Sequence, residues 1–248
     1  MFNRIYALLE SCASDSPLFP PTILYNEGWL LRLVLDWFQN HRTGEHPLSF
    51  TIDSSWFSEA LLPSAFQARY RGDTLAESST HLDGVIGHFI IGSTGKTDFS
   101  LLSNALQLVA CEAKMFSSLS SGIKNARYFD QAARNVACIA EVLRRANRHP
   151  SEVPTLGFCV LAPESQIERG IFAKEIKRES IHSKVQQRVG EYGGVKDQWY
   201  KEWFQPTLHN IEIRTLSWEE TIEDIRDHDA DSGDAIERFY QHCVKFNG

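Results

Sequence analysis

The sequence contains no closely paired cysteines, no long apolar runs and no excess of basic residues, which argues against disulfide-rich, membrane-spanning and broadly nucleic-acid-coating proteins. Its 248 residues include five widely spaced cysteines without a Cys-x-x-Cys pair, which favours core thiols over disulfides or zinc ligands. No apolar run has the length of a membrane span, and residues 1–10 lack the pattern of a signal peptide. We therefore expect a cytoplasmic protein without a membrane partner.

The balance of charge is acidic. The formal net charge is −7, which argues against a wholly basic surface that coats nucleic acid indiscriminately. The sequence also contains no zinc finger or helix-turn-helix pattern. A local basic face remains possible.

The most informative feature is an acid and a base at the end of an apolar run. Residues 105–115 are typical of a buried strand, and in a strand Glu112 and Lys114 share one face. Burying opposite charges is costly unless each finds a partner or a metal. Asp83 is the only acid in a second strand-like run, 81–87. We therefore expect two carboxylates and a lysine to converge.

The spacing of apolar residues predicts alternating helices and strands. Asn26 is an expected helix N-cap, and Glu27 lies on the inward stripe of the helix that follows. The further expected elements are a short strand at 48–52, a helix at 56–62, a strand at 82–92, a turn at 93–98, one or two strands at 99–116, a serine-rich loop at 116–122, a helix at 123–147, a strand at 155–161, a helix at 171–189, a strand at 211–216, and two C-terminal helices around an acidic turn at 227–234.

A strand, a helix and a second strand in succession place those two strands parallel in one sheet. The sequence therefore predicts a single α/β domain over residues 1–248, with a three-layer core at about 22–165, a mixed sheet, and a C-terminal extension at about 166–248 that adds helices.

This order of elements and acids resembles the PD-(D/E)XK nuclease superfamily, whose restriction-endonuclease-like core has the order αβββαβ. The likeness covers about residues 27–161, and five residues in the expected order carry it: Glu27, Asp83, Glu112, Lys114 and Gln131. Leu82 stands where the family name has proline. The resemblance implies a magnesium-dependent endonuclease, a hydrolase that cuts DNA in restriction, repair or mobile-element defence.

The resemblance also implies roles for single residues. Asp83 and Glu112 would ligate Mg²⁺, for which Mn²⁺ can substitute, together with the backbone carbonyl of Ala113. Lys114 would position and activate the attacking water. Glu27 matches an acid on the first core helix, and Gln131 matches a glutamine that braces the site, with Asn135 one turn later.

The loop after the second acid motif offers donors for phosphate. It contains Ser117, Ser118, Lys124 and Arg127 without an intervening acid, and such groups commonly hold a nucleic-acid backbone. We expect this loop to bind the substrate. A double-strand cut needs two active sites or two visits, so a homodimer or a partner subunit is also expected.

Each assignment has a structural alternative. Glu112 and Lys114 are also explained as an ion pair at a sheet edge, and Glu27 as a charge that favours the positive end of its helix. Gln131 and Asn135 are also explained as surface residues. His81 is expected to be structural or solvent-facing, although it could also reach a metal.

Two further patterns are set aside. Residues 92–97 resemble a phosphate-binding loop, but Ile90 stands where that motif needs glycine, and a hairpin turn explains the segment better. The aromatic residues between 199 and 204 favour a core over base stacking.

Two other functions stay open at this point. One is a nuclease-like fold without turnover that binds nucleic acid or protein. The other is an unrelated enzyme with paired carboxylates, such as a glycoside hydrolase, in which Lys114 would be dispensable.

Overall fold

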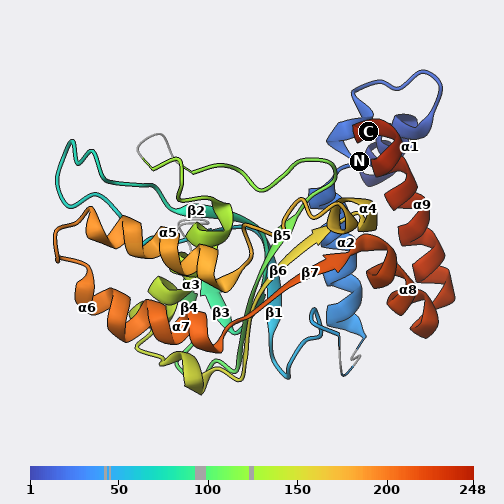
Figure 1. The fold of residues 1–248 in the computed structure, drawn as a ribbon. Helices are drawn as coiled ribbons and strands as arrows, with labels where there is room; N and C mark the ends of the chain where they lie inside the picture. Colours follow the sequence, from blue (N-terminus) through green and yellow to red (C-terminus); the bar gives the residue numbers. More distant parts are fainter. Residues whose placement is uncertain (42–43, 45, 93–98, 123–125) are drawn as a thin grey trace.

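The structure is a computed structural model that describes residues 1–41, 44, 46–92, 99–122 and 126–248. At its centre is a five-stranded mixed sheet with helices on both faces (Figure 1). In spatial order the strands are β1 (Ser55–Leu62), β2 (Thr80–Gly87), β5 (Gln107–Ala113), β6 (Thr155–Ala162) and β7 (Glu212–Ser217). The first two pairings are antiparallel, and β5, β6 and β7 run parallel. The predicted α/β class and mixed sheet are confirmed.

Two hydrophobic clusters pack on the two faces of this sheet. The helices are α1 (Phe2–Glu10), α2 (Glu27–Asn40), α3 (Gln131–Arg145), α4 (Glu164–Glu168), α5 (Arg178–Gly190), α6 (Asp197–Trp199), α7 (Gln205–Asn210), α8 (Trp218–His228) and α9 (Ala230–Asn247). One cluster contains buried residues of α3 and α5, and the other contains buried residues of α2, α8 and α9. None of the helices in the described ranges is long and apolar enough to cross a membrane. All five cysteines are free and buried, as expected.

Strand β5 is the central element of the fold, and all seven of its residues are buried. Its side chains alternate between the two clusters: Leu108 and Ala110 pack with α3, whereas Val109 and Cys111 pack with α2. The same alternation directs Glu112 toward α3. The position of this acid therefore follows from a period-two pattern that the sequence already contains.

Side-chain caps fix the starts of the two core helices. The Asn26 carboxamide oxygen accepts from the Trp29 N–H at 3.0 Å, which begins α2 where the sequence predicted. The Asp130 carboxylate accepts from the Ala133 N–H at 3.1 Å and begins α3 at Gln131. The helix expected at 123–147 is therefore shorter at its N-terminal end; residues 123–125 lie outside the described residues.

The predictions for residues 48–62 are wrong. Residues 48–52 form no strand, and the segment expected as a helix at 56–62 belongs to β1, which pairs with β2 along its length. The spacing of the apolar residues in 56–62 fits either a helix or a strand. As a strand, the segment satisfies its backbone hydrogen bonds by pairing with β2. Glu59, with a φ of 59°, interrupts the pairing of β1 with β2 at the position opposite Asp83. The pairs on either side of this interruption are Ser58 with Gly84 and Ala60 with Leu82.

The strand expected at 82–92 is divided at Gly87. Gly87 has a φ of +152°, and a Cβ at this position would lie 2.3 Å from the Gln107 carbonyl oxygen. The chain then leaves the main sheet as β3 (Phe89–Ile91), which pairs with β4 (Phe99–Leu101) in a separate two-stranded sheet. The turn expected at 93–98, including the glycine-rich motif, lies outside the described residues.

Replacing Gly87 with alanine is expected to destabilise the fold by about 2–4 kcal/mol, because a side chain would meet backbone atoms of β5 in a backbone conformation that L-residues disfavour. Urea unfolding of the two proteins measures the difference. Gly190→Ala is the control, since nothing lies within 4 Å of a Cβ there. Equal stability of the Gly87 variant and the parent would show that the β2–β5 contact is looser than described.

The C-terminal segment adds a strand as well as helices. The strand expected at 211–216 is β7, which joins the sheet beside β6, and the Ser217 hydroxyl caps α8 by accepting from the Glu220 N–H at 2.9 Å. The helix expected at 171–189 begins later, at Arg178. No acidic turn spans 227–234, because Asp229 alone separates α8 from α9 and caps the second helix.

Candidate active site

The structure brings Asp83, Glu112 and Lys114 together where β2 and β5 lie side by side. The Lys114 Nζ lies 2.6 Å from the Glu112 Oε1. The Asp83 Oδ2 accepts from the Ala113 N–H at 2.8 Å, which ties this acid to the backbone between the other two residues. The convergence expected from the sequence is therefore present.

Helix α3 supplies a second set of donors to Glu112. The Gln131 Nε2 donates to the Glu112 Oε1, and the Asn135 Nδ2 lies 3.4 Å from the Glu112 Oε2. Gln131 and Asn135 are one helical turn apart and therefore lie on one face. They are not free surface residues: Asn135 is fully buried, and Gln131 also accepts from the Ser120 N–H at 3.0 Å. Gln131 thus joins the serine-rich loop to the buried acid.

Glu112 holds its proton unusually tightly. Its side chain is only 2% exposed, and this burial, followed by the charge of nearby Asp83, raises its pKa to about 8, while Lys114 acts in the opposite direction. Two carboxylates with one lysine leave negative charge uncompensated when both are ionised. This site therefore favours either a proton or a further cation.

Trp218 fixes the backbone at the lysine. Its indole Nε1 donates to the Lys114 carbonyl oxygen at 2.9 Å, and the Lys114 N–H donates to the Leu161 carbonyl oxygen at 2.8 Å. Trp218 is fully buried at the start of α8. Sequence reasoning missed this contact, because nothing in the local pattern links residues that are 104 positions apart.

Glu59 is a second residue that sequence reasoning missed. It lies opposite Asp83 in the β1–β2 pairing, and its positive φ is unusual for a non-glycine residue. Its carboxylate pairs with Arg32 of α2 at 3.5 Å. A helix at residues 56–62, as expected from the apolar spacing, would not have placed an acid beside Asp83.

Glu27 is not joined to these residues. It is partly exposed at the first position of α2, and within the described part of the chain no hydrogen bond or ion pair connects it with Asp83, Glu112 or Lys114. It lies instead near Cys243 of α9. The pKa of the Cys243 thiol is raised to about 12, mainly by burial and to a smaller extent by the charge of Glu27.

The predicted phosphate-binding residues lie in the loop between β5 and α3. Ser117, Ser118 and Arg127 are exposed, and Arg127 forms no ion pair with another described residue. Lys124 lies outside the described residues. Gly122 anchors the loop, because a Cβ there would lie 2.0 Å from the Ala126 carbonyl oxygen. The exposed hydroxyls and the Arg127 guanidinium remain open to a ligand.

The donor set fits a hard cation in part. Asp83 and Glu112 offer carboxylate oxygens, which Mg²⁺ prefers, and Mg²⁺ commonly keeps several waters when few protein ligands are present. Among the described residues, no group of three or more His, Cys, Asp or Glu side chains is placed to hold a metal ion. A cation here would therefore need two carboxylates, a backbone carbonyl such as that of Ala113, and water.

The remaining expectations concern histidines and aromatic residues. His81 is exposed, and His88 is buried with its Nε2 2.8 Å from the Ile52 carbonyl oxygen, a structural role. Trp199, Tyr200 and Phe204 are buried in the α3-side cluster, so the expectation of a core role for this aromatic group is confirmed.

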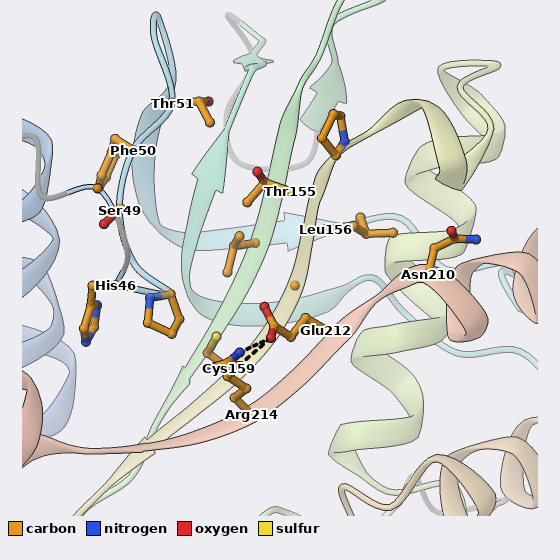
Figure 2. A pocket seen from close by; sticks show the side chains of 15 residues that line it. His46, Ser49, Phe50, Thr51, Thr155, Leu156, Cys159, Asn210, Glu212 and Arg214 are labelled. Carbon is orange, nitrogen blue, oxygen red and sulfur yellow. Dashed lines mark hydrogen bonds and ion pairs between the residues drawn. The ribbon is translucent and has the colours of Figure 1, made fainter.

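A separate pocket lies at the opposite ends of the parallel strands. It has a volume of about 520 Å³ and lies between the loop that contains His46 and the start of β7 (Figure 2). None of the predicted site residues that the structure describes lines it. Its charged residues, Glu212 and Arg214, pair with each other and are each more than half exposed. The pocket is also lined by the partly buried His46 imidazole, whose pKa burial lowers, and by the Cys159 thiol, whose pKa burial raises to about 12.

Comparison with known proteins adds no assignment. No family model matches the chain, and no match is found among the curated proteins or the solved structures. The function must therefore be argued from the arrangement of Asp83, Glu112 and Lys114.

Proposed function

We propose that this protein is a metal-dependent nuclease that hydrolyses DNA phosphodiester bonds, as a restriction, repair or mobile-element defence enzyme does. The observation that carries the proposal is the convergence of Asp83, Glu112 and Lys114 at adjacent strand ends, with Glu112 buried and its pKa raised. Perturbed acids that converge with a lysine are typical of active sites.

The order of the elements supports the same proposal. Apart from the small β3–β4 sheet, the chain runs through α2, β1, β2, β5, α3 and β6, which is the αβββαβ order of the restriction-endonuclease-like core. In that arrangement the acids come from the second and third strands of the main sheet, as Asp83 and Glu112 do here. We therefore propose that the chain has the restriction-endonuclease-like fold as well as its order of acids.

The residues divide the work of hydrolysis. Asp83 and Glu112, with the Ala113 carbonyl, would hold Mg²⁺ or Mn²⁺; when bound, the ion offsets phosphate charge and lowers the pKa of a bound water. Lys114, next to Glu112, orients the attacking water by hydrogen bonding. Gln131 and Asn135 keep the Glu112 carboxylate in place, and Ser117, Ser118 and Arg127 hold the phosphate backbone.

A second function is favoured by one observation. Glu112 already accepts from Lys114, Gln131 and Asn135, so few of its lone pairs are free for a metal. A nuclease-like protein that binds DNA or a partner protein without cutting would also preserve this network. The two functions differ in whether added metal produces strand cleavage.

The test is a cleavage assay on supercoiled plasmid with magnesium, with manganese and with a chelator. We expect the parent to nick or linearise the plasmid only when metal is present. Lys114→Ala should reduce the rate at least about 100-fold, because the attacking water loses its donor. Lys201→Ala, a change at an exposed lysine outside the site, should cut at the parental rate.

Three results would reject this mechanism. Equal cleavage by the parent and by a folded Lys114→Ala variant would remove the lysine from the chemistry. The binding function would be favoured if the protein bound DNA but cut neither the plasmid nor any of a panel of single-stranded and duplex oligonucleotides. Hydrolysis of a glycosidic substrate without added metal would instead identify a different enzyme class.

A further inference from the structure

A groove of about 710 Å³ opens beside the candidate active site. It is formed by Phe116 and Ser118, which follow β5, by Ser165, Gln166 and Arg169 of α4 and its C-terminal end, and by the end of α9. These segments are far apart in the sequence, and Figure 1 shows α4 and the end of α9 near the strand ends.

The groove begins close to Lys114. Two residues of extended chain span at most about 7 Å, so the Phe116 backbone lies within that distance of the Lys114 backbone. On the neighbouring strand, Leu161 accepts from the Lys114 N–H, and α4 begins three residues later at Glu164. The groove therefore starts close enough to Lys114 for one bound substrate to contact both.

Gln166 is the unusual residue of the groove. The residue as a whole is only 6% exposed, yet its side-chain amide forms no hydrogen bond with another described residue. The amide atoms are not among the solvent-inaccessible polar atoms that lack a partner, so they reach solvent through the groove that Gln166 lines. The carboxamide therefore offers a donor and an acceptor to whatever occupies the groove.

The other lining residues suit a nucleotide. Phe116 is 39% exposed and offers a ring on which a base can stack. Arg169 is exposed and forms no ion pair with any described residue, so its guanidinium is free to meet phosphate. Ser118 and Ser165 are exposed hydroxyl donors. The aromatic ring can stack on a base, the cation can pair with a phosphate, and the carboxamide can hydrogen-bond to the edge of the base.

We propose that this groove binds the nucleotide that adjoins the cleaved phosphate, with its base stacked on Phe116, its edge hydrogen-bonded to Gln166 and its phosphate paired with Arg169. The inference rests on the nuclease function proposed above and makes Gln166 the residue that selects the base. A carboxamide donates and accepts at once, so adenine, which presents a donor beside an acceptor, is the best match.

The experiment measures cleavage of oligonucleotides randomised around the cut, with the products sequenced. We expect the parent to prefer one base next to the cut by at least about fivefold, and Gln166→Ala to lower that preference to below about twofold while it still cleaves. Gln187→Ala, at an exposed glutamine of α5, should keep the preference. The inference is overturned if the parent shows no base preference, or if Gln166→Ala keeps the preference of the parent. Either result leaves the proposed nuclease function unaffected.

A binding measurement separates this inference from the proposed function. The affinity of a short fluorescent single-stranded oligonucleotide is measured without metal for the parent, Phe116→Ala and Arg169→Ala. Both changes are at partly or fully exposed positions and should leave the fold intact. We expect roughly tenfold weaker binding for Phe116→Ala, and a log–log salt slope smaller by about one for Arg169→Ala. Unchanged binding in both variants overturns the groove, whereas weaker binding by an inactive protein supports the groove and rejects the nuclease.

Discussion

Glu112→Gln is expected to lower metal-dependent DNA cleavage by about three orders of magnitude, which corresponds to about 4 kcal/mol of transition-state stabilisation. The amide has nearly the shape of the acid, but it carries no charge for a cation and offers one oxygen acceptor instead of two. Asp83→Asn should have an effect of similar size, because the two carboxylates would share one ion. Single-turnover cleavage of a labelled duplex measures the rates.

The controls distinguish chemistry from folding. Glu179→Gln changes an exposed acid of α5 and should cleave at the parental rate. Circular dichroism and thermal unfolding show whether Glu112→Gln keeps its structure, and DNA affinity in Ca²⁺ shows whether it keeps its substrate. A folded Glu112→Gln variant that binds and cuts as the parent does would exclude Glu112 as a metal ligand.

The stability of the metal-free protein is expected to fall as pH rises from about 5 to about 8, because Glu112 is buried. The pKa of this acid is raised from 4.5 to about 8 in the folded protein. Between these values the folded state keeps a proton that the unfolded chain releases, so unfolding becomes more favourable as pH increases. This one group contributes up to about 4 kcal/mol over that window.

Urea unfolding at several pH values, in chelator, measures this dependence. The difference between the parent and Glu112→Gln isolates Glu112, because Glu77, whose pKa burial also raises, is present in both proteins. The difference in unfolding free energy between the two proteins should grow from about pH 5 to about pH 8 and should stay constant above. Parallel stability curves for the two proteins would show that Glu112 ionises normally.

Metal should reverse this trend. A divalent cation binds the ionised carboxylate, so it must displace the proton, and its affinity should increase up to about tenfold per pH unit below about pH 8. Calorimetric titration of Mn²⁺ in two buffers of different ionisation enthalpy measures the released proton. Glu112→Gln should release none, and release equal to that of the parent would place the proton on another group.

Sequence periodicity was sufficient to predict the elements whose buried residues recur with the period of a strand or a helix. The alternation in β5 placed Glu112 and Lys114 on one face and gave both a common environment. The Asn26 and Ser217 caps, the parallel β6 and the α3 face with Gln131 and Asn135 were likewise predictable, because each depends on contacts within a few residues or on one standard crossover.

Tertiary pairing decided the other elements. The segment at 56–62 carries apolar residues that suit a helix or a strand, and only its pairing with β2 makes it β1. That pairing also places Glu59 opposite Asp83, although its side chain turns to Arg32. Glu27, by contrast, lies on the expected helix but near α9 and not in the site, because the angle at which α2 crosses the sheet depends on packing.

Composition and local pattern account for the secondary-structure elements, the acidic balance and the three residues that carry the proposed chemistry. The surroundings of these residues depend on the packed fold: the Trp218 bond to the Lys114 carbonyl, the Asp83 bond to the Ala113 N–H, and the groove that Gln166 faces. These contacts join residues tens to more than a hundred positions apart. No local propensity encodes them, because their geometry follows from how the whole sheet and its helices pack.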